Sequence, residues 1–105
     1  MKPTHIFLKA DAKINAFADY IASENIDASM RFLEAIEKTF DNLNQHPGIG
    51  STRYAHLPLL EGLRVWAVSG FENYLIFYIE RSTHVDVLRI LHGARDIPIA
   101  LREAY

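Results

Sequence analysis

The sequence predicts an α+β domain in which a helical hairpin packs on a small, mostly antiparallel sheet. Two N-terminal segments carry apolar residues at helical spacing, and the hydrophobic period changes to two from Leu63 onward. The later segments are joined by short connections, which favour antiparallel neighbours. The predicted order is therefore β-α-α-β-β-β, followed by a short C-terminal helix (β-α-α-β-β-β(-α)).

The first helix is expected over residues 10–23, where one face carries Ile14, Phe17, Ala18 and Ile21. Residues 24–27 form a break with two potential N-cap side chains. The second helix then places its apolar residues on one side, at Phe32, Leu33, Ile36, Phe40 and Leu43. It should end by His46, because Pro47 restricts the residue before it and Gly48 follows. So short a break predicts an antiparallel hairpin with one shared apolar seam.

Three strands are expected at residues 63–68, 74–80 and 85–91, which are rich in β-branched and aromatic residues. The middle one is apolar on both faces and should be the most buried. An extra strand is expected at residues 5–8, at the N-terminal end. A last helix is expected from Pro98, with Asp96 as a candidate cap.

Length and composition indicate one ordinary globular domain spanning residues 1–105. Half of the residues are apolar and 23% are charged. The chain has no cysteine, so disulfides and thiolate metal sites are excluded. The apolar run at residues 6–8 is too short for a signal peptide or a membrane span, so the expected location is the cytoplasm.

The charge balance gives no indication of a nucleic-acid-binding protein. The net charge is −2, whereas proteins that grip nucleic-acid backbones usually carry a strongly basic face, so sequence-specific DNA binding is not expected. Lysine occurs only at positions 2, 9, 13 and 38, and from Arg53 onward each Lys or Arg position is an arginine. Arginine pairs bidentately with carboxylates and phosphates alike, so this bias indicates either a recognition surface or an ordinary solvated face.

The end of the last predicted strand carries the main candidate chemistry. His92, Gly93, Arg95 and Asp96 follow an apolar run directly. A catalytic interpretation makes His92 a general acid or base and Arg95 a stabiliser of phosphate charge. A structural interpretation, which is favoured, has Asp96 capping the last helix and pairing with Arg95, Gly93 permitting the turn, and His92 partly buried.

Two strand arginines and the tryptophan are further candidates for a recognition surface. Arg64 and Arg89 could project toward the same end of the sheet as His92, or could be surface strand residues. Trp66 is a candidate stacking platform, although packing on the sheet is the favoured interpretation.

No metal or cofactor site is predicted. His5, His46, His56 and His84 are scattered along the chain without a paired ligand spacing. The glycines of the loop that begins at Pro47 lack a phosphate-loop lysine, so they are interpreted as turn glycines.

The order and spacing of several short motifs resemble the ParE branch of the ParE/RelE toxin superfamily over nearly the whole chain. The loop motif Pro-x-x-Gly-x-x-Arg is matched by Pro47, Gly50 and Arg53, and the strand motif Gly-Leu-Arg by Gly62, Leu63 and Arg64. The segment Gly-Phe-x-x-Tyr-x-Ile-x-Tyr is matched by Gly70, Phe71, Tyr74, Ile76 and Tyr78. The ending His-Gly-x-Arg-Asp is matched by His92, Gly93, Arg95 and Asp96. One departure is Lys13-Ile14, where the family often has Asp-Leu.

This resemblance implies a bacterial toxin that inhibits DNA gyrase by binding and is neutralised by a cognate ParD-like antitoxin, either as a homodimer or in a hetero-oligomer with that antitoxin. The expected target-binding residues are Arg64, Trp66, Arg89, His92 and Arg95. The antitoxin is expected on the apolar seam of the hairpin, at Ile14, Phe17, Ile21, Phe32, Ile36 and Phe40.

Two alternatives remain open from the sequence. The similar RelE branch cleaves ribosome-bound mRNA, and here Arg64, His92 and Arg95 would form a minimal catalytic site. Three features weaken this alternative: the negative net charge, the absence of lysine from the sheet region, and Tyr105 as the only tyrosine after Tyr78. The third hypothesis is a non-toxic module that only binds an antitoxin.

Overall fold

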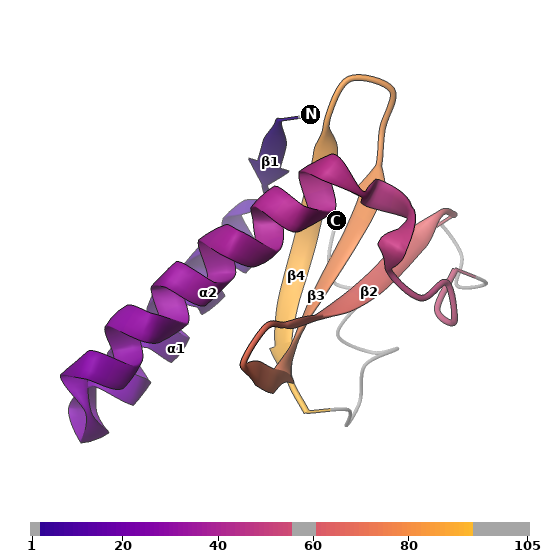
Figure 1. Ribbon diagram of the computed structural model, residues 1–105. Helices are drawn as coiled ribbons and strands as arrows, with labels where there is room; N and C mark the ends of the chain where they lie inside the picture. The colour runs from indigo at the N-terminus through magenta and orange to yellow at the C-terminus, as the bar shows by residue number, and fades with distance from the viewer. Residues whose placement is uncertain (1–2, 56–60, 94–105) are drawn as a thin grey trace.

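The protein forms two antiparallel helices packed on one face of a four-stranded sheet, as a computed structural model that describes residues 3–55 and 61–93 shows (Figure 1). The elements are β1 (Thr4–Ile6), α1 (Leu8–Glu24), α2 (Ile26–Gln45), the 3₁₀ turn η1 (Pro47–Ile49), β2 (Leu63–Val68), β3 (Phe71–Glu80) and β4 (Val85–His92). The sheet order is β1-β4-β3-β2, with β1 parallel to β4 and the other pairs antiparallel. The predicted fold class is confirmed. The predicted C-terminal helix lies outside the described residues.

The helical hairpin forms where the apolar spacing predicts it. The Asn25 side chain accepts a hydrogen bond from the Ala28 N–H at 3.0 Å and so caps α2, as an N-cap asparagine should. At the crossing of the helices, the buried Ser29 hydroxyl donates to the Ala18 carbonyl at 2.6 Å. No helix among the described residues is both long and apolar enough to cross a lipid bilayer.

The bounds of β1, β3 and β4 differ from the sequence prediction, the last by one residue. The connection between β2 and β3 was expected to occupy residues 69–73, but it is a two-residue turn in which Gly70 has φ of 81°. Phe71 therefore belongs to β3, where its ring packs 5.3 Å from that of Phe32. At the N-terminal end, β1 is shorter than expected because Leu8 already begins α1.

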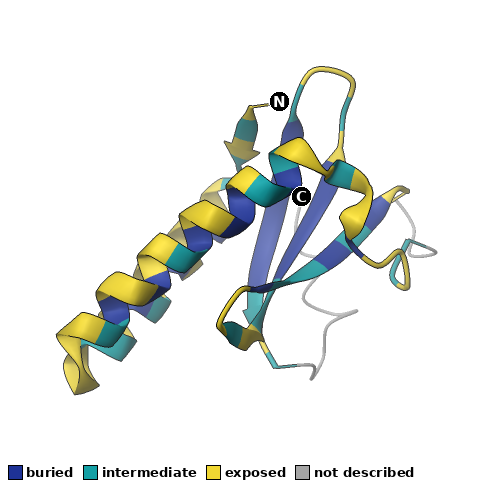
Figure 2. Cartoon of the chain, in the orientation of Figure 1, coloured by how far each residue is buried: buried dark blue, intermediate teal, exposed yellow. Residues whose placement is uncertain are grey.

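The apolar residues of the sheet lie in two clusters on its opposite faces. The helix-facing cluster contains Phe32, Ile36 and Phe40 of α2 together with Ile76, Tyr78, Val87 and Ile90 of the sheet. The second cluster contains Leu63, Val65, Phe77, Ile79 and Leu88. Residues 76–79 are at most 3% exposed, so this part of β3 is buried on both faces. The prediction that the middle strand is the most buried is wrong, because β4 has six buried residues and β3 has four. Figure 2 shows the buried side of the helices turned toward the sheet and their exposed side turned away.

The loop after α2 is fastened to the sheet by two side chains. The buried Tyr78 hydroxyl donates to the Pro47 carbonyl at 2.8 Å and accepts from the Gly50 N–H at 2.9 Å. Arg64 Nη1 donates to the carbonyls of Gly48 and Gly50 at 3.2 and 2.8 Å. Burial is the main cause that raises the pKa of Tyr78, opposed by its hydrogen bond with Gly50 and by the charge of Arg64. The tyrosine therefore stays a neutral donor.

Gly50→Ala tests this close approach. A Cβ at residue 50 would lie 2.6 Å from the Tyr78 hydroxyl oxygen and 3.0 Å from Arg64 Cβ. We expect the free energy of unfolding to fall by about 1–3 kcal/mol, because overpacking forces neighbouring atoms to shift. The matched control is Gly48→Ala, whose Cβ would meet no atom within 4 Å. Equal stability of the two variants in urea unfolding would contradict a close approach of Gly50 to Tyr78.

Asp86 is a buried carboxylate near the start of β4, beside strand β1. Its carboxylate is 9% exposed, and Oδ2 accepts from Arg81 Nε at 2.9 Å. Oδ1 lies 3.1 Å from His5 Nδ1 and 2.9 Å from His84 Nε2. Desolvation raises the pKa of Asp86, but the hydrogen bonds from Arg81 and His5 and the charges of His84 and Arg81 outweigh it, so the pKa lies below its usual value.

Asp86→Asn should lower the free energy of unfolding at pH 7 by about 1–3 kcal/mol, because charge-assisted hydrogen bonds are lost. A carboxyl group with a lowered folded pKa stabilises the fold above its unfolded pKa of about 3.9. That stabilisation is lost as the pH falls through the folded value. Denaturant unfolding of chelator-treated protein from pH 7 to pH 2 should show the difference between wild type and variant shrinking in acid. A constant difference, or one matched by the exposed control Asp41→Asn, would contradict this role.

Candidate functional site

The expected target-binding residues lie at separate places on the sheet. Arg64 pairs with Tyr78 on the β2 side of β3, whereas His92 pairs with Tyr74 on the β4 side. Four residues along β3 and two strand spacings separate them, roughly 13 Å along the strand and 10 Å across. Arg64 and His92 therefore do not meet around one phosphate. Arg95 lies outside the described residues.

Arg64 and Trp66 are both half-buried, and each is engaged by other parts of the fold. The Arg64 guanidinium is engaged by the carbonyls of Gly48 and Gly50. Trp66 is half-buried and packs against the helix-facing core. This agrees with the sheet-packing interpretation of Trp66.

Arg89 lies in a groove between β4 and α1. The side chain is 9% exposed, so the interpretation of Arg89 as a surface strand residue is wrong. It lines an open groove of about 420 Å³ together with Lys9, Ala12, Lys13 and Ala16 of α1, which we call the basic groove. The short side chains of Ala12 and Ala16 leave the space open on the side of α1, and the cationic residues Lys9, Lys13 and Arg89 border it. Such a groove suits carboxylates or phosphates.

His92 ends β4 beside a group of aromatic rings. Its ring centroid lies 4.4 Å from that of Tyr74 and 6.3 Å from that of Phe17. Tyr74 in turn lies 4.9 Å from Phe32, which contacts Phe71. We call these five residues the aromatic cluster. Since His92 is exposed, the prediction of a partly buried histidine is wrong, and its imidazole is open to a partner.

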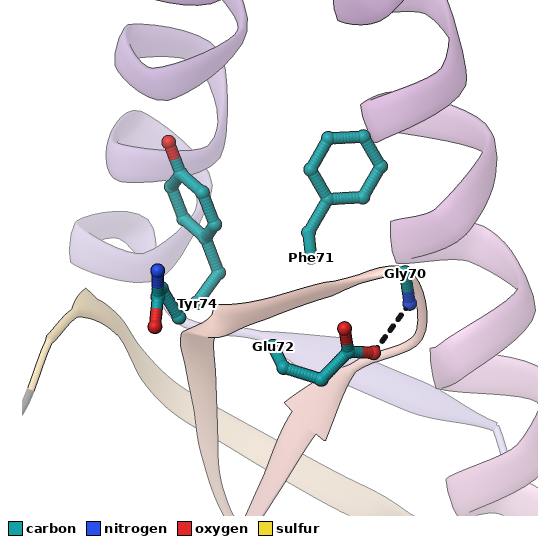
Figure 3. A pocket seen from close by; sticks show the side chains of 5 residues that line it. Gly70, Phe71, Glu72 and Tyr74 are labelled. Carbon is teal, nitrogen blue, oxygen red and sulfur yellow. Dashed lines mark hydrogen bonds between the residues drawn. The ribbon is translucent and has the colours of Figure 1, made fainter.

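The aromatic cluster borders both the basic groove and a second hollow. The Lys13 ammonium lies 5.3 Å above the Phe17 ring centroid, a cation–π contact that joins the groove to the cluster. On the other side, residues 70–74 line a shallow hollow of about 300 Å³. Figure 3 shows the rings of Phe71 and Tyr74 directed toward the helices, while Glu72 bends back to accept from the Gly70 N–H at 2.6 Å. Desolvation, together with the charge of Tyr20, raises the pKa of Tyr74.

Four of the six residues expected to bind the antitoxin are core residues. Ile14, Phe32, Ile36 and Phe40 are 7%, 0%, 4% and 9% exposed. Their seam is covered by the protein's own sheet, so a partner on the outside of the folded domain cannot rest on them. Phe17 and Ile21 are half-buried and pack at the edge of the same cluster. The prediction that Ile14, Phe32, Ile36 and Phe40 bind the antitoxin is therefore wrong, because these residues form the core.

Residues 8–97 match the family described as "ParE toxin of type II toxin-antitoxin system, parDE". The chain belongs to the ParE toxin family. A solved structure described as "Chromosomal ParDE TA system from P. aeruginosa" is similar to this chain, with a TM-score of 0.70 and 19% sequence identity over 90% of this chain and 98% of that chain. At this identity the likeness shows the fold. No curated protein matches the sequence.

Sequence reasoning missed the lysines of the basic groove. Lys9 and Lys13 stand four residues apart on a helix, with Ala12 and Ala16 beside them. That spacing indicates a basic face with small side chains, but it does not reveal that β4 brings Arg89 under it. Lys13 also occupies the position noted as a departure from the ParE pattern.

A comparison of Phe32→Ala with Phe17→Ala tests which of the two rings belongs to the core. Phe32→Ala should lower the free energy of unfolding by about 3–5 kcal/mol, because it empties a fully buried ring site. Phe17→Ala should cost markedly less, since half-buried surface loses less on truncation. Urea unfolding measures both. Similar losses would mean that Phe17 is part of the core and is not available to a partner.

Proposed function

We propose that this ParE-family toxin inhibits DNA gyrase by binding it, and that a cognate ParD-like antitoxin neutralises it in the cytoplasm. The match of residues 8–97 to the ParE toxin family carries the proposal. A type II toxin has a protein antitoxin, so the domain needs an outward surface for at least that partner.

The basic groove and its aromatic border support binding best among the described residues. Lys9, Lys13 and Arg89 supply positive charge, and the half-buried Phe17 ring and the exposed His92 ring supply adjoining aromatic surface. Charged rims with aromatic anchors are typical of protein interfaces. Carboxylates of a protein partner would complement the three cations. We propose that gyrase uses this surface and that the antitoxin neutralises the toxin by covering it.

The separation of Arg64 from His92 speaks against the ribonuclease alternative. Acid-base cleavage of RNA needs a proton-transfer group and a charge stabiliser within hydrogen-bond reach of one phosphate. Arg64 is instead engaged with backbone carbonyls of the loop after α2. Binding without cleavage is therefore the favoured mechanism.

Lys13→Glu tests the proposed surface. A carboxylate in place of this ammonium should weaken inhibition of gyrase supercoiling at least about tenfold, because a like-charge contact in an interface costs several kcal/mol. Induced expression without antitoxin should then slow growth less than wild type does. Lys38→Glu, the same charge change at an exposed position of α2, is the control and should leave both readouts unchanged.

The outcomes separate the three functions. Equal potency of Lys13→Glu and wild type would reject the surface. Cleaved transcripts in translating ribosomes with normal supercoiling would establish the ribonuclease alternative. Unimpaired growth at high expression of the wild type would leave an antitoxin-binding module.

A further inference from the structure

Three side chains of kinds that bind metals lie together where β1 pairs with the start of β4. The aromatic cluster lies at the other end of β4. His5 lies on β1, Asp86 is its register partner on β4, and His84 ends the turn between β3 and β4. One ligand atom from each of these residues lies within 4.8 Å of the other two. Their distance in sequence explains why the histidine spacing gave no indication of a metal site. The parallel pairing of β1 with β4 creates the juxtaposition.

From this geometry we propose that His5, His84 and Asp86 bind one divalent transition-metal ion of the Zn²⁺ class. Two imidazoles and one carboxylate are a ligand set that zinc accepts. Ligands bound 2.0–2.1 Å from a tetrahedral ion lie roughly 3.4 Å apart. The two histidine nitrogens already lie 3.1 and 2.9 Å from Asp86 Oδ1. Small side-chain adjustments would therefore admit the ion.

Neighbouring groups orient two of the three ligands. The Thr83 hydroxyl lies 3.0 Å from His84 Nδ1, which leaves Nε2 on the side of Asp86. Arg81 Nε binds Asp86 Oδ2 and leaves Oδ1 for the ion. Outer hydrogen bonds of this kind fix the ring orientation and tautomer of metal-binding histidines. The Arg81 charge lowers the affinity for a dication, so moderate binding is expected.

The third ligand is largely exposed, so the site is open to solvent on that side. The His5 side chain is 66% exposed, so it can rotate toward the ion and leave a coordination position for water. The bound ion would cross-link β1 to the β3–β4 turn. Since β1 pairs with β4 over only three residues, the ion would stabilise the least extensively paired strand of the sheet.

Isothermal titration of the chelator-treated full chain with ZnCl₂ at pH 7 tests the site. Wild type should bind one ion per chain, and MgCl₂ should give no saturable heat. His5→Gln and His84→Gln should each weaken Zn²⁺ binding at least about tenfold, and Thr83→Val should weaken it by about 10-fold through loss of orientation. His46→Gln, which removes an exposed histidine at the C-cap of α2, is the control and should bind as wild type does.

Thermal unfolding gives a second readout. Zn²⁺ at a concentration that saturates wild type should raise the Tm of wild type and of His46→Gln, because the ion binds the folded state, and should raise that of His84→Gln less. Far-UV circular dichroism confirms that each variant is folded. No saturable Zn²⁺ binding by wild type, or unchanged affinity in His84→Gln, would overturn the proposal. So would an equal loss in His46→Gln.

Discussion

The apolar stripe of α2 packs into the helix-facing core of the sheet, and this contact determines which surfaces remain for other molecules. Phe32, Ile36 and Phe40 are used by the protein's own core. An amphipathic helix normally turns its apolar side inward and its polar side to water, and α2 follows that rule. The outward side of α1 is different, because its small and basic residues face a groove floored by Arg89. The seam that looked suited to an antitoxin is the seam that holds the domain together.

The sheet is also held at both ends by polar side chains that emerge from buried strands. On the β2 side, Tyr78 and Arg64 bind the loop after α2 through its carbonyls and one N–H. On the β1 side, the Asp86 carboxylate lies within hydrogen-bond distance of Arg81, His5 and His84. Buried polar groups require partners, so each arrangement fixes the backbone that supplies them. The two arrangements thus tie the loop after α2 and strand β1 to the central strands.

Periodicity was sufficient to predict the fold class and both helices, since the helical stripe and the alternating strands bury one continuous core. Strand ends were less predictable. Phe71 lies between the strands expected at residues 63–68 and 74–80, but pairing with Val68 and contact with Phe32 place it in β3. Of the candidate site, His92 was recognised from its position after a strand. The partnership of Arg89 with Lys9 and Lys13, and that of His5 with His84, arise from packing between distant segments, which local patterns do not encode.

Hydrogen–deuterium exchange of the chain with and without its cognate antitoxin tests most directly whether the hairpin seam is core and the α1 groove is the partner surface. Exchange should slow in peptides that cover Lys9 to Phe17 and the end of β4, because a bound partner covers them. Core peptides of α2 and β3 should stay as protected as in the free chain, since the folded core need not open. Faster exchange in α2 and β3 on binding, or no change along α1, would contradict the account.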